Sequence, residues 1–501
     1  MGRLNRAAAT ALLVFAASNQ HLANAQQPPP RFCIVPALDG APTAADHGDT
    51  WRISVAFFEI PHLPAPVFTP SNRRGQWTID RNRRLVRYEG PFPKSFLDAG
   101  NWVEEPWSSR VVAVTYGGGV SVLEAGSSRF VKMYGATQSN GYNGGANYAG
   151  IQILPRRRLT IAITNGEMPL VVGGDRLHAW MTPDELKQHG LRGIRNLQDA
   201  PSLGATIVLD ADGHIHVVTD DDKWSEIGSI DRDDHGQVID IGNPGVVLYE
   251  SGRSVLAIRK VDDNGSKYFA ALTLATAAFN AGSAIKASPL FHQILAYDGT
   301  WPMHLWPRWR RLGPEGFADI EGGDVGIALA EIGAGGNYHD LPSLHRGVIQ
   351  GRDSLFLYDG TRVTPVANGG SDRVDKFAHV YDLHSIGRVL VASKKGLFEL
   401  TADGALVHRP MPFPTEGLAE PAITDWPEAG VALVSTKSGM FVLDGDLHAE
   451  SVAGGEQVGF SGWWSVVRPI AAANATELVL TATPGLFLAV DSSRSLDNPC
   501  R

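Results

Sequence analysis

Cysteine is nearly absent from this chain of 501 residues, which has only two, Cys33 and Cys500. Two cysteines so far apart exclude a dense disulfide framework and every motif that needs neighbouring cysteines. Charge is also scarce, because 19% of the residues are charged and the net charge is −9. A mildly acidic chain has no general attraction to nucleic acid or to an anionic membrane surface, so we expect neither as a partner.

The common catalytic signatures are missing as well. The sequence has no Gly-x-Ser-x-Gly elbow, no Walker loop and no His-Glu-x-x-His pair. The apolar run from Ala7 to Ala17 is shorter than the about 20 residues that cross a bilayer, and no later run is long enough. We therefore expect no membrane span and no enzyme class that depends on these motifs.

The first 25 residues have the pattern of a signal peptide. Arg3 and Arg6 precede the apolar run, and the small residues Ala23 and Ala25 suit a signal peptidase that cleaves before Gln26. We interpret residues 1–25 as a signal peptide and residues 26–501 as one domain. The mature protein would then be periplasmic or secreted.

The two cysteines lie at opposite ends of the expected mature chain. Disulfides persist in the compartments that exported proteins reach, so we predict a bond between Cys33 and Cys500. That bond requires the two ends of the chain to meet in space. The alternative is a pair of buried, unbonded thiols.

The C-terminal third of the sequence repeats a strand hairpin. Each copy has an apolar strand, a small-residue exit, a turn and a second apolar strand. The turn glycines Gly396, Gly439 and Gly485 are 43 and 46 residues apart, and Ser354 takes the place of the glycine in an earlier copy. The four copies span Val348–Leu357, Val389–Leu400, Ala432–Leu443 and Leu478–Leu488.

A repeat of about 40 to 50 residues built from short strands is typical of the blades of a β-propeller. One four-stranded sheet cannot cover both of its apolar faces, whereas sheets stacked around a ring cover one another. Weaker hairpins bring the number to about nine, and one or two of these could be extra strands of a neighbouring blade. Their turns lie near Gly119, Met168, Gly213, Gly252 and Gly299.

We therefore predict an all-β fold, a single β-propeller of about eight four-stranded blades, with seven as the alternative. The segment from Phe32 to Tyr88 would add strands to the blade that contains Gly485, so that strands from both termini close the ring. Asp-Gly pairs that begin at Asp359 and Asp444 are typical of two-residue turns between strands.

The copies around Val391 and Val434 resemble the propeller repeats in the periplasmic sensor regions of two-component regulators. In those repeats an apolar strand leads through a small-residue turn to Gly-Leu-Phe/Tyr-x-Leu and then Asp-Gly, as at Gly396–Leu400 and Asp403. The resemblance covers roughly residues 345 to 490. It implies architecture and not activity, because such repeats occur in propellers of unrelated function.

Two segments have the composition of ligand contacts. Flat aromatic rings stack on sugars or apolar ligands, and arginines bind carboxylate or phosphate, so the segment from Trp301 to Arg311 is our preferred binding region. A Gly- and Asn-rich stretch with two tyrosines is a second candidate loop. The candidate residues are Trp301, His304, Trp306, Arg308, Trp309, Tyr142 and Tyr148. The alternatives are aromatic packing between blades for the first segment and a flexible turn for the second.

Two histidine patterns could carry chemistry. His339 and Asp340 precede a repeat strand, where side chains often face the central funnel of a propeller, and such a pair can transfer protons. His214 and His216 lie two apart on a predicted strand and so share a face, which can begin a metal site. The alternative for the second pair is two surface histidines beside a polar turn.

We expect an exported binding module for a protein or for a small-molecule or carbohydrate ligand, and we expect a monomer. The alternative is an enzyme on the same scaffold, such as a polysaccharide lyase, glycosidase or lactonase, with its active site in the central funnel. A third possibility is a scaffold for an envelope complex. No cofactor is predicted, although a structural or site cation would fit.

Overall fold

The structure is a computed structural model. It describes residues 30–36, 56–58, 67–69, 76–79, 85–88, 102–115, 119–127, 130–135, 148–164, 169–174, 176–230, 237–240, 246–250, 254–263, 266–276, 285–298, 308–313, 316–323, 337–350, 354–369, 373–374, 378–413, 423–436, 439–455, 467–469, 477–482, 485–493 and 500. The expected signal peptide lies outside these residues. Among the described helices, none is long and apolar enough to cross a bilayer.

The described strands form ten sheets, nine of four strands and one of five. The first five are β2–β5 (Ala56–Phe58, Val67–Thr69, Gln76–Ile79, Leu85–Tyr88), β6–β9 (Trp102–Glu104, Val111–Thr115, Gly119–Leu123, Val131–Lys132), β10–β14 (Tyr134–Gly135, Tyr148–Leu154, Leu159–Thr164, Pro169–Val172, Arg176–Ala179), β15–β18 (Ile194–Ala200, Ala205–Asp210, His214–Thr219, Trp224–Ser229) and β19–β22 (Gln237–Ile239, Val246–Glu250, Ser254–Asp263, Ser266–Thr276).

The other five continue the same plan. They are β23–β26 (Ile285–Ser288, Gln293–Asp298, Arg308–Gly313, Gly316–Asp319), β27–β30 (Asn337–Leu341, Arg346–Gln350, Leu355–Tyr358, Val363–Pro365), β31–β34 (His379–Leu383, Arg388–Ser393, Gly396–Leu400, Leu406–His408), β35–β38 (Ile423–Trp426, Val431–Thr436, Gly439–Leu443, Ala449–Ser451) and β39–β41 (Val467–Pro469, Glu477–Ala482, Gly485–Asp491) with β1 (Phe32–Pro36).

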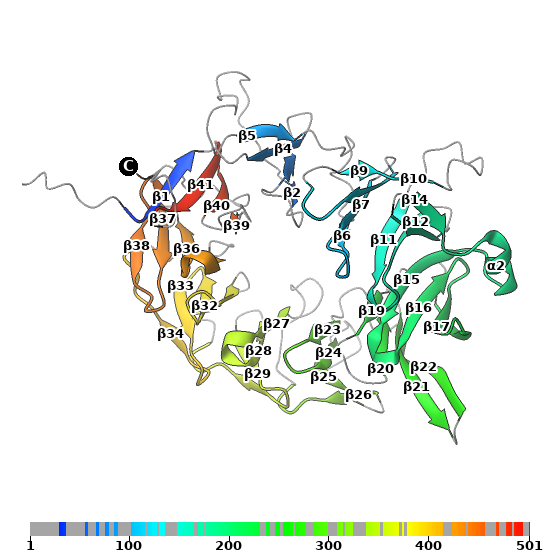
Figure 1. The fold of residues 1–501 in the computed structure, drawn as a ribbon. Coiled ribbons are helices and arrows are strands. Elements are labelled where there is room, and N and C mark those ends of the chain that lie inside the picture. The colour runs from blue at the N-terminus through cyan, green and yellow to red at the C-terminus, as the bar shows by residue number, and fades with distance from the viewer. Residues whose placement is uncertain are drawn as a thin grey trace, which may run out of the picture.

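These sheets follow one another around a ring, which confirms the all-β propeller (Figure 1). First strands such as β2, β6, β27 and β39 lie toward the centre, and last strands such as β26, β34 and β38 lie at the outer rim. Within the sheets the consecutive strands pair antiparallel. Among the described sheets, one strand pair is parallel: the two-residue strand β10 pairs with β14.

The number of sheets differs from the expected eight for two reasons. Each of the nine hairpins found in the sequence belongs to a separate sheet, including the weak ones near Gly119 and Gly252. In addition, β2–β5 pair with each other, so within the segment from Phe32 to Tyr88 only β1 joins the last sheet among the described strands. Antiparallel strands joined by short connections usually pair with their neighbours in sequence, which explains this separate sheet.

The apolar core lies between adjacent sheets. In β32, Val389 and Val391 pack in a cluster with Val348 of the preceding sheet. Leu390 and Ala392, which point the other way, pack in a cluster with Val434 of the following sheet. Side chains alternate along a strand, so a strand buried on both faces joins the two neighbouring blades.

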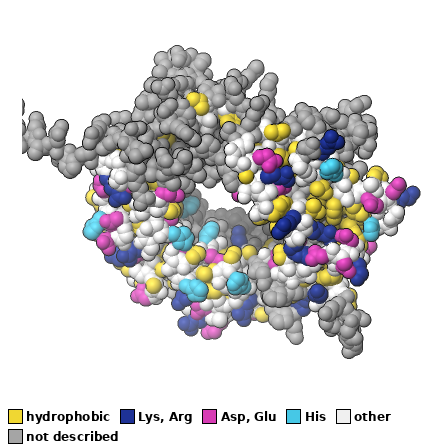
Figure 2. Space-filling view, in the orientation of Figure 1, with side chains coloured by type: hydrophobic (Ala, Val, Ile, Leu, Met, Phe, Trp, Pro, Cys, Tyr) yellow, Lys and Arg dark blue, Asp and Glu magenta, His cyan; other side chains and the backbone are white. Residues whose placement is uncertain are grey.

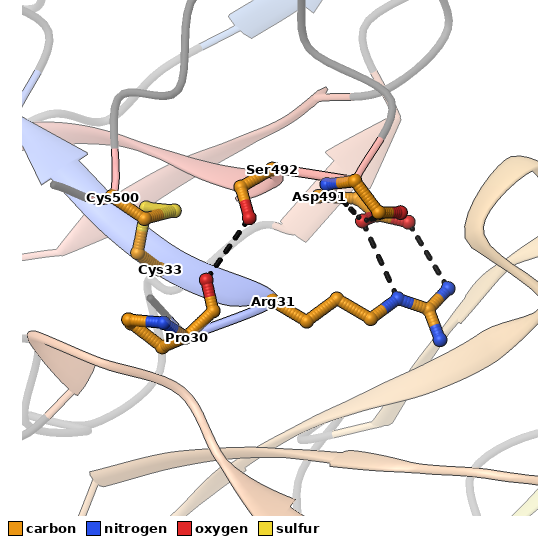
Figure 3. The surroundings of a disulfide bond; sticks show 7 residues. Pro30, Arg31, Cys33, Asp491, Ser492 and Cys500 are labelled. Atoms are coloured by element: carbon orange, nitrogen blue, oxygen red, sulfur yellow. Dashed lines mark hydrogen bonds and ion pairs between the residues drawn. A yellow bond between two sulfur atoms is a disulfide. The ribbon is translucent and has the colours of Figure 1, made fainter. Parts of the chain in front are cut away.

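Strand β1 closes the ring. It pairs antiparallel with β41, with Cys33 opposite Val490. Cys33 forms a disulfide with Cys500, and their Cα atoms are 5.6 Å apart (Figure 3). The backbone N–H of Ile34 also donates to the carbonyl oxygen of Ala453, 2.7 Å away, in the preceding blade. The predicted closure by strands from both termini, and the disulfide that secures it, are confirmed.

An ion pair lies beside this junction. Arg31 Nη2 is 3.1 Å from Asp491 Oδ2, and the Asp491 side chain has no exposed surface (Figure 3). Burial opposes ionisation of Asp491, but hydrogen bonds from Arg31 and Ser493 hold its pKa below the usual value. The Ser492 hydroxyl donates to the carbonyl oxygen of Pro30 on the same side.

A carboxylate on the inner strand of one sheet, or directly after it, also binds the turn of the sheet before it. This turn joins the inner strand to the next strand of its sheet. In four sheets it contains a short 3-10 helix with proline at its first position: η3 (Pro155–Arg157), η4 (Pro201–Leu203), η6 (Pro342–Leu344) and η7 (Pro427–Ala429). The backbone N–H donors and their acceptors are Arg156 and Asp199, Ser202 and Asp240, Leu290 and Asp340, Ser343 and Asp382, and Ser385 and Asp425. We call these five contacts the aspartate links.

Two local predictions have different outcomes. The segment after Thr182 forms α2 (Pro183–Gln188), and the Thr182 hydroxyl accepts from the backbone N–H of Glu185 in a capping box. The Asp359-Gly360 pair was predicted as a two-residue turn, but four residues separate Tyr358 from its partner Val363. Asp359 Oδ1 accepts from the backbone N–H groups of Thr361 and Arg362, so the aspartate stabilises a wider turn.

Candidate functional site

His339 lies on β27, an inner strand of the ring, as the sequence suggested (Figure 1). Its side chain is exposed. Partial burial, Lys286 on β23 and His379 on β31 all lower the pKa of His339. Three successive inner strands therefore place basic side chains close enough for their charges to act on one another. We call Lys286, His339 and His379 the inner basic cluster.

Asp340 does not complete a proton-transfer pair with His339. Asp340 Oδ1 accepts hydrogen bonds from the hydroxyls of Ser288, at 2.7 Å, and Tyr338, at 2.6 Å. Its Oδ2 accepts from the backbone N–H of Leu290 at 2.9 Å. Both oxygens are thus engaged by an aspartate link, and neighbouring side chains on a strand point to opposite faces.

Histidines are also frequent on the turns of this part of the ring. His292, His345 and His384 are exposed, and each lies in the turn between the first and second strands of its sheet. Figure 2 shows several histidine side chains along the rim of the central hollow, over the arc of the ring that runs from β27 to β38. His292 and His345 each directly precede the second strand of their sheet, whereas His384 directly follows the first strand, so the repeat pattern does not predict this arc.

The preferred aromatic segment is only partly described. Trp309 is fully buried in the core between two sheets, 6.1 Å from the Tyr338 ring between centroids. It therefore cannot stack on a ligand, and the prediction that it contacts one is wrong. Arg308 begins β25, and nothing more is described of its side chain. Trp301, His304 and Trp306 lie outside the described residues.

The second candidate loop is likewise mostly outside the described residues. Tyr142 lies there, and Tyr148 begins the inner strand β11. That position places Tyr148 on the central side of its sheet, but its side chain is not described. A ligand role for both tyrosines stays a prediction.

His214 and His216 lie together on β17, as predicted, and Asp210 at the end of β16 joins them. Asp210 Oδ2 is 3.1 Å from His216 Nε2 and 3.3 Å from His214 Nδ1. Burial opposes ionisation of Asp210, but hydrogen bonds from His216 and from the backbone N–H of His214 hold its pKa below the usual value. This group lies on a hairpin within its sheet and does not belong to the inner basic cluster (Figure 1).

Comparison with known proteins finds only remote structural likeness. No protein-family model and no curated protein matches it. The chain is similar to the extracellular domain of a hybrid two-component system from B. thetaiotaomicron, at 11% identity and a TM-score of 0.30, over 89% of this chain and 58% of that chain. It covers 62% of the extracellular domain of a second hybrid two-component system from B. thetaiotaomicron.

Enzymes are also among the similar structures. Dihydro-heme d1 dehydrogenase matches at 10% identity and a TM-score of 0.36, over 84% of this chain and 77% of that chain. Virginiamycin B lyase from Staphylococcus aureus matches at 12% identity and a TM-score of 0.30, over 66% of this chain and 97% of that chain. These likenesses, at identities of 10% to 12%, assign no activity to this chain.

Proposed function

We propose that this protein is an exported binding module that takes up an anionic ligand at its central opening. An acidic oligosaccharide or an acidic segment of a partner protein would fit. The observation that supports this most directly is the inner basic cluster, which places one lysine and two histidines on neighbouring inner strands of a protein whose net charge is −9. Neighbouring carboxylates on the same strands, Asp340 and Asp382, are engaged by aspartate links instead.

The proposed ligand contact depends on pH in a defined direction. The pKa of His339 lies below its usual value, so His339 is neutral near pH 7 and gains charge only as the pH falls below about 6.5. A bound anion favours the protonated form. Binding should therefore strengthen as the pH is lowered from 7.5 to 5.5.

The test is fluorescence anisotropy with two labelled probes, an oligoglutamate and an oligogalacturonate, against neutral dextran. At pH 5.5, where His339 is more protonated than at pH 7.5, Lys286→Ala and His339→Ala should each weaken binding of the acidic probe by about fivefold, because an exposed ion pair contributes up to about 1 kcal/mol. His448→Ala, at an exposed histidine of the outer hairpin between β37 and β38, should leave binding unchanged. Equal binding of dextran, or full binding by both inner variants, would contradict the proposal.

Export is the second part of the proposal. The Cys33–Cys500 disulfide supports it, because such bonds persist in oxidising compartments. N-terminal sequencing of the protein recovered from the periplasm or medium should begin at Gln26. Recovery of the chain only from the cytoplasm with Met1 retained would argue against export.

A further inference from the structure

The hairpin of β16 and β17 lies toward the outer side of its sheet, near α2 and apart from the inner basic cluster (Figure 1). Its turn brings together one carboxylate and two imidazoles. One ligand atom each from Asp210, His214 and His216 lies within 4.8 Å of the others. This is the one such group of three among the described residues.

The turn fixes the direction of the Asp210 carboxylate. Its Oδ1 accepts from the backbone N–H groups of Asp212, at 2.9 Å, and His214, at 2.8 Å. Its Oδ2 therefore faces the two imidazoles. Hydrogen bonds of this kind, which hold an otherwise ligating carboxylate in place, accompany metal sites in general.

The surroundings also hold His216 in place. Asp210 is 2% exposed and His216 is 6% exposed. The His216 ring lies edge-on to Trp224, with centroids 6.0 Å apart, and Trp224 in turn stacks on His189 at 4.9 Å. His214, by contrast, has a side chain that is 44% exposed, so solvent reaches the group from one side.

We propose that Asp210 Oδ2, His214 Nδ1 and His216 Nε2 form a binding site for a divalent transition-metal ion such as Zn²⁺, with a water molecule as the fourth ligand. Zinc bonds to histidine nitrogen and carboxylate oxygen are about 2.0–2.2 Å long, so neighbouring ligand atoms of a tetrahedral site are about 3.3 Å apart. The carboxylate lies 3.1 and 3.3 Å from the two nitrogens, which matches this spacing for two of the three ligand pairs, and all three ligand atoms lie within 4.8 Å of one another.

The hairpin of β37 and β38 has the same turn, so comparing the two hairpins separates features of the turn from features of the proposed metal site. Asp444 Oδ1 accepts from the backbone N–H groups of Asp446 and His448, as Asp210 does from Asp212 and His214. The strand registers are equivalent, since Leu443 pairs with Ala449 and Leu209 pairs with Ile215. Exposed Glu450 stands where His216 stands in the proposed site. The two hairpins therefore share the turn, in which an aspartate accepts two backbone N–H groups. The buried imidazole of His216 is present in one hairpin only, so the turn does not require it.

The test is isothermal titration calorimetry of the full mature chain, made without a histidine tag and stripped with a chelator, using Zn²⁺ as the probe. Wild type and the matched control His448→Ala should each bind one equivalent. His214→Ala removes an exposed ligand, and His216→Phe keeps a ring against Trp224. Both should weaken binding by more than roughly 100-fold, because loss of an outer partner alone costs roughly 10- to 100-fold.

Co²⁺ provides an independent readout, because a tetrahedral site with two imidazoles gives an intense visible absorption that hydrated Co²⁺ lacks. We expect this absorption in wild type and in His448→Ala, and its loss in His214→Ala. Absence of stoichiometric Zn²⁺ binding in wild type would overturn the proposal. Unchanged binding in His214→Ala would also overturn it, whether or not His216→Phe folds.

Discussion

At the scale of the residue, the aspartate links show how one side chain can join two sheets. Asp340 lies near the end of an inner strand and binds the preceding sheet through the Ser288 hydroxyl and the backbone N–H of Leu290. The sequence contains a signal for these links, Asp-x-Pro at residues 199–201, 340–342 and 425–427. It was not recognised, because each carboxylate bonds to a turn about 40 to 50 residues earlier, and periodicity within one hairpin does not show that contact.

Asp340→Ala tests the energetic weight of such a link. The substitution leaves the buried Tyr338 hydroxyl and the Leu290 N–H without this acceptor, and each such loss costs about 1–3 kcal/mol. We expect the free energy of unfolding to fall by about 2–4 kcal/mol, measured by chemical denaturation. Asp446→Ala, at an exposed turn residue, is the control and should change it by less than about 0.5 kcal/mol. Equal effects of both substitutions would refute the role of the link.

At the scale of the element, the hairpins were the most predictable feature. The copy at Val389–Leu400 corresponds to β32 and β33 almost residue by residue, because side chains that alternate between two buried faces give each strand a continuous apolar run. The same alternation predicts that the Trp309 side chain points to the opposite face from the arginines on either side of it. The Trp309 side chain is indeed buried. Strand geometry was enough to predict that His214 and His216 share a face. The position of Asp210 beside both imidazoles depends on the shape of the turn, which the sequence pattern did not predict.

Gly347 on β28 gives a prediction about one hairpin. A Cβ atom at this position would overlap the phenol ring of Tyr338, which lies on the paired strand β27. Gly347→Ala should displace Tyr338 and lower the free energy of unfolding by about 1–3 kcal/mol, as overpacking in a core does. Thermal and chemical unfolding would measure it. At Gly174 an added Cβ meets open space, so Gly174→Ala is the control and should be near neutral.

At the scale of the whole molecule, stability depends on joining the two ends of the chain. The sequence predicted this join from the positions of the two cysteines and from the ring architecture. It did not predict ten sheets, because the strands of residues 56–88 are only three or four residues long and carry no repeat signature. Short strands are stabilised mainly by neighbouring sheets, and local sequence does not encode that stabilisation.

The double variant Cys33→Ser and Cys500→Ser tests the contribution of the join. The cysteines are 467 residues apart in sequence, and the loop-entropy account gives roughly 6 kcal/mol for a closed loop of this length. We expect the variant to unfold at a clearly lower denaturant concentration than oxidised wild type. Reduced wild type should behave like the variant. If all three unfolded together, the disulfide would contribute nothing to the stability of the ring.

The most direct test of the closed ring is disulfide mapping by mass spectrometry of the exported protein, digested without reduction. We predict one linked pair of peptides, in which the N-terminal peptide with Cys33 is bonded to the C-terminal peptide with Cys500. Two free thiols, or a bond between two different chains, would show that the ends of the chain do not meet as described.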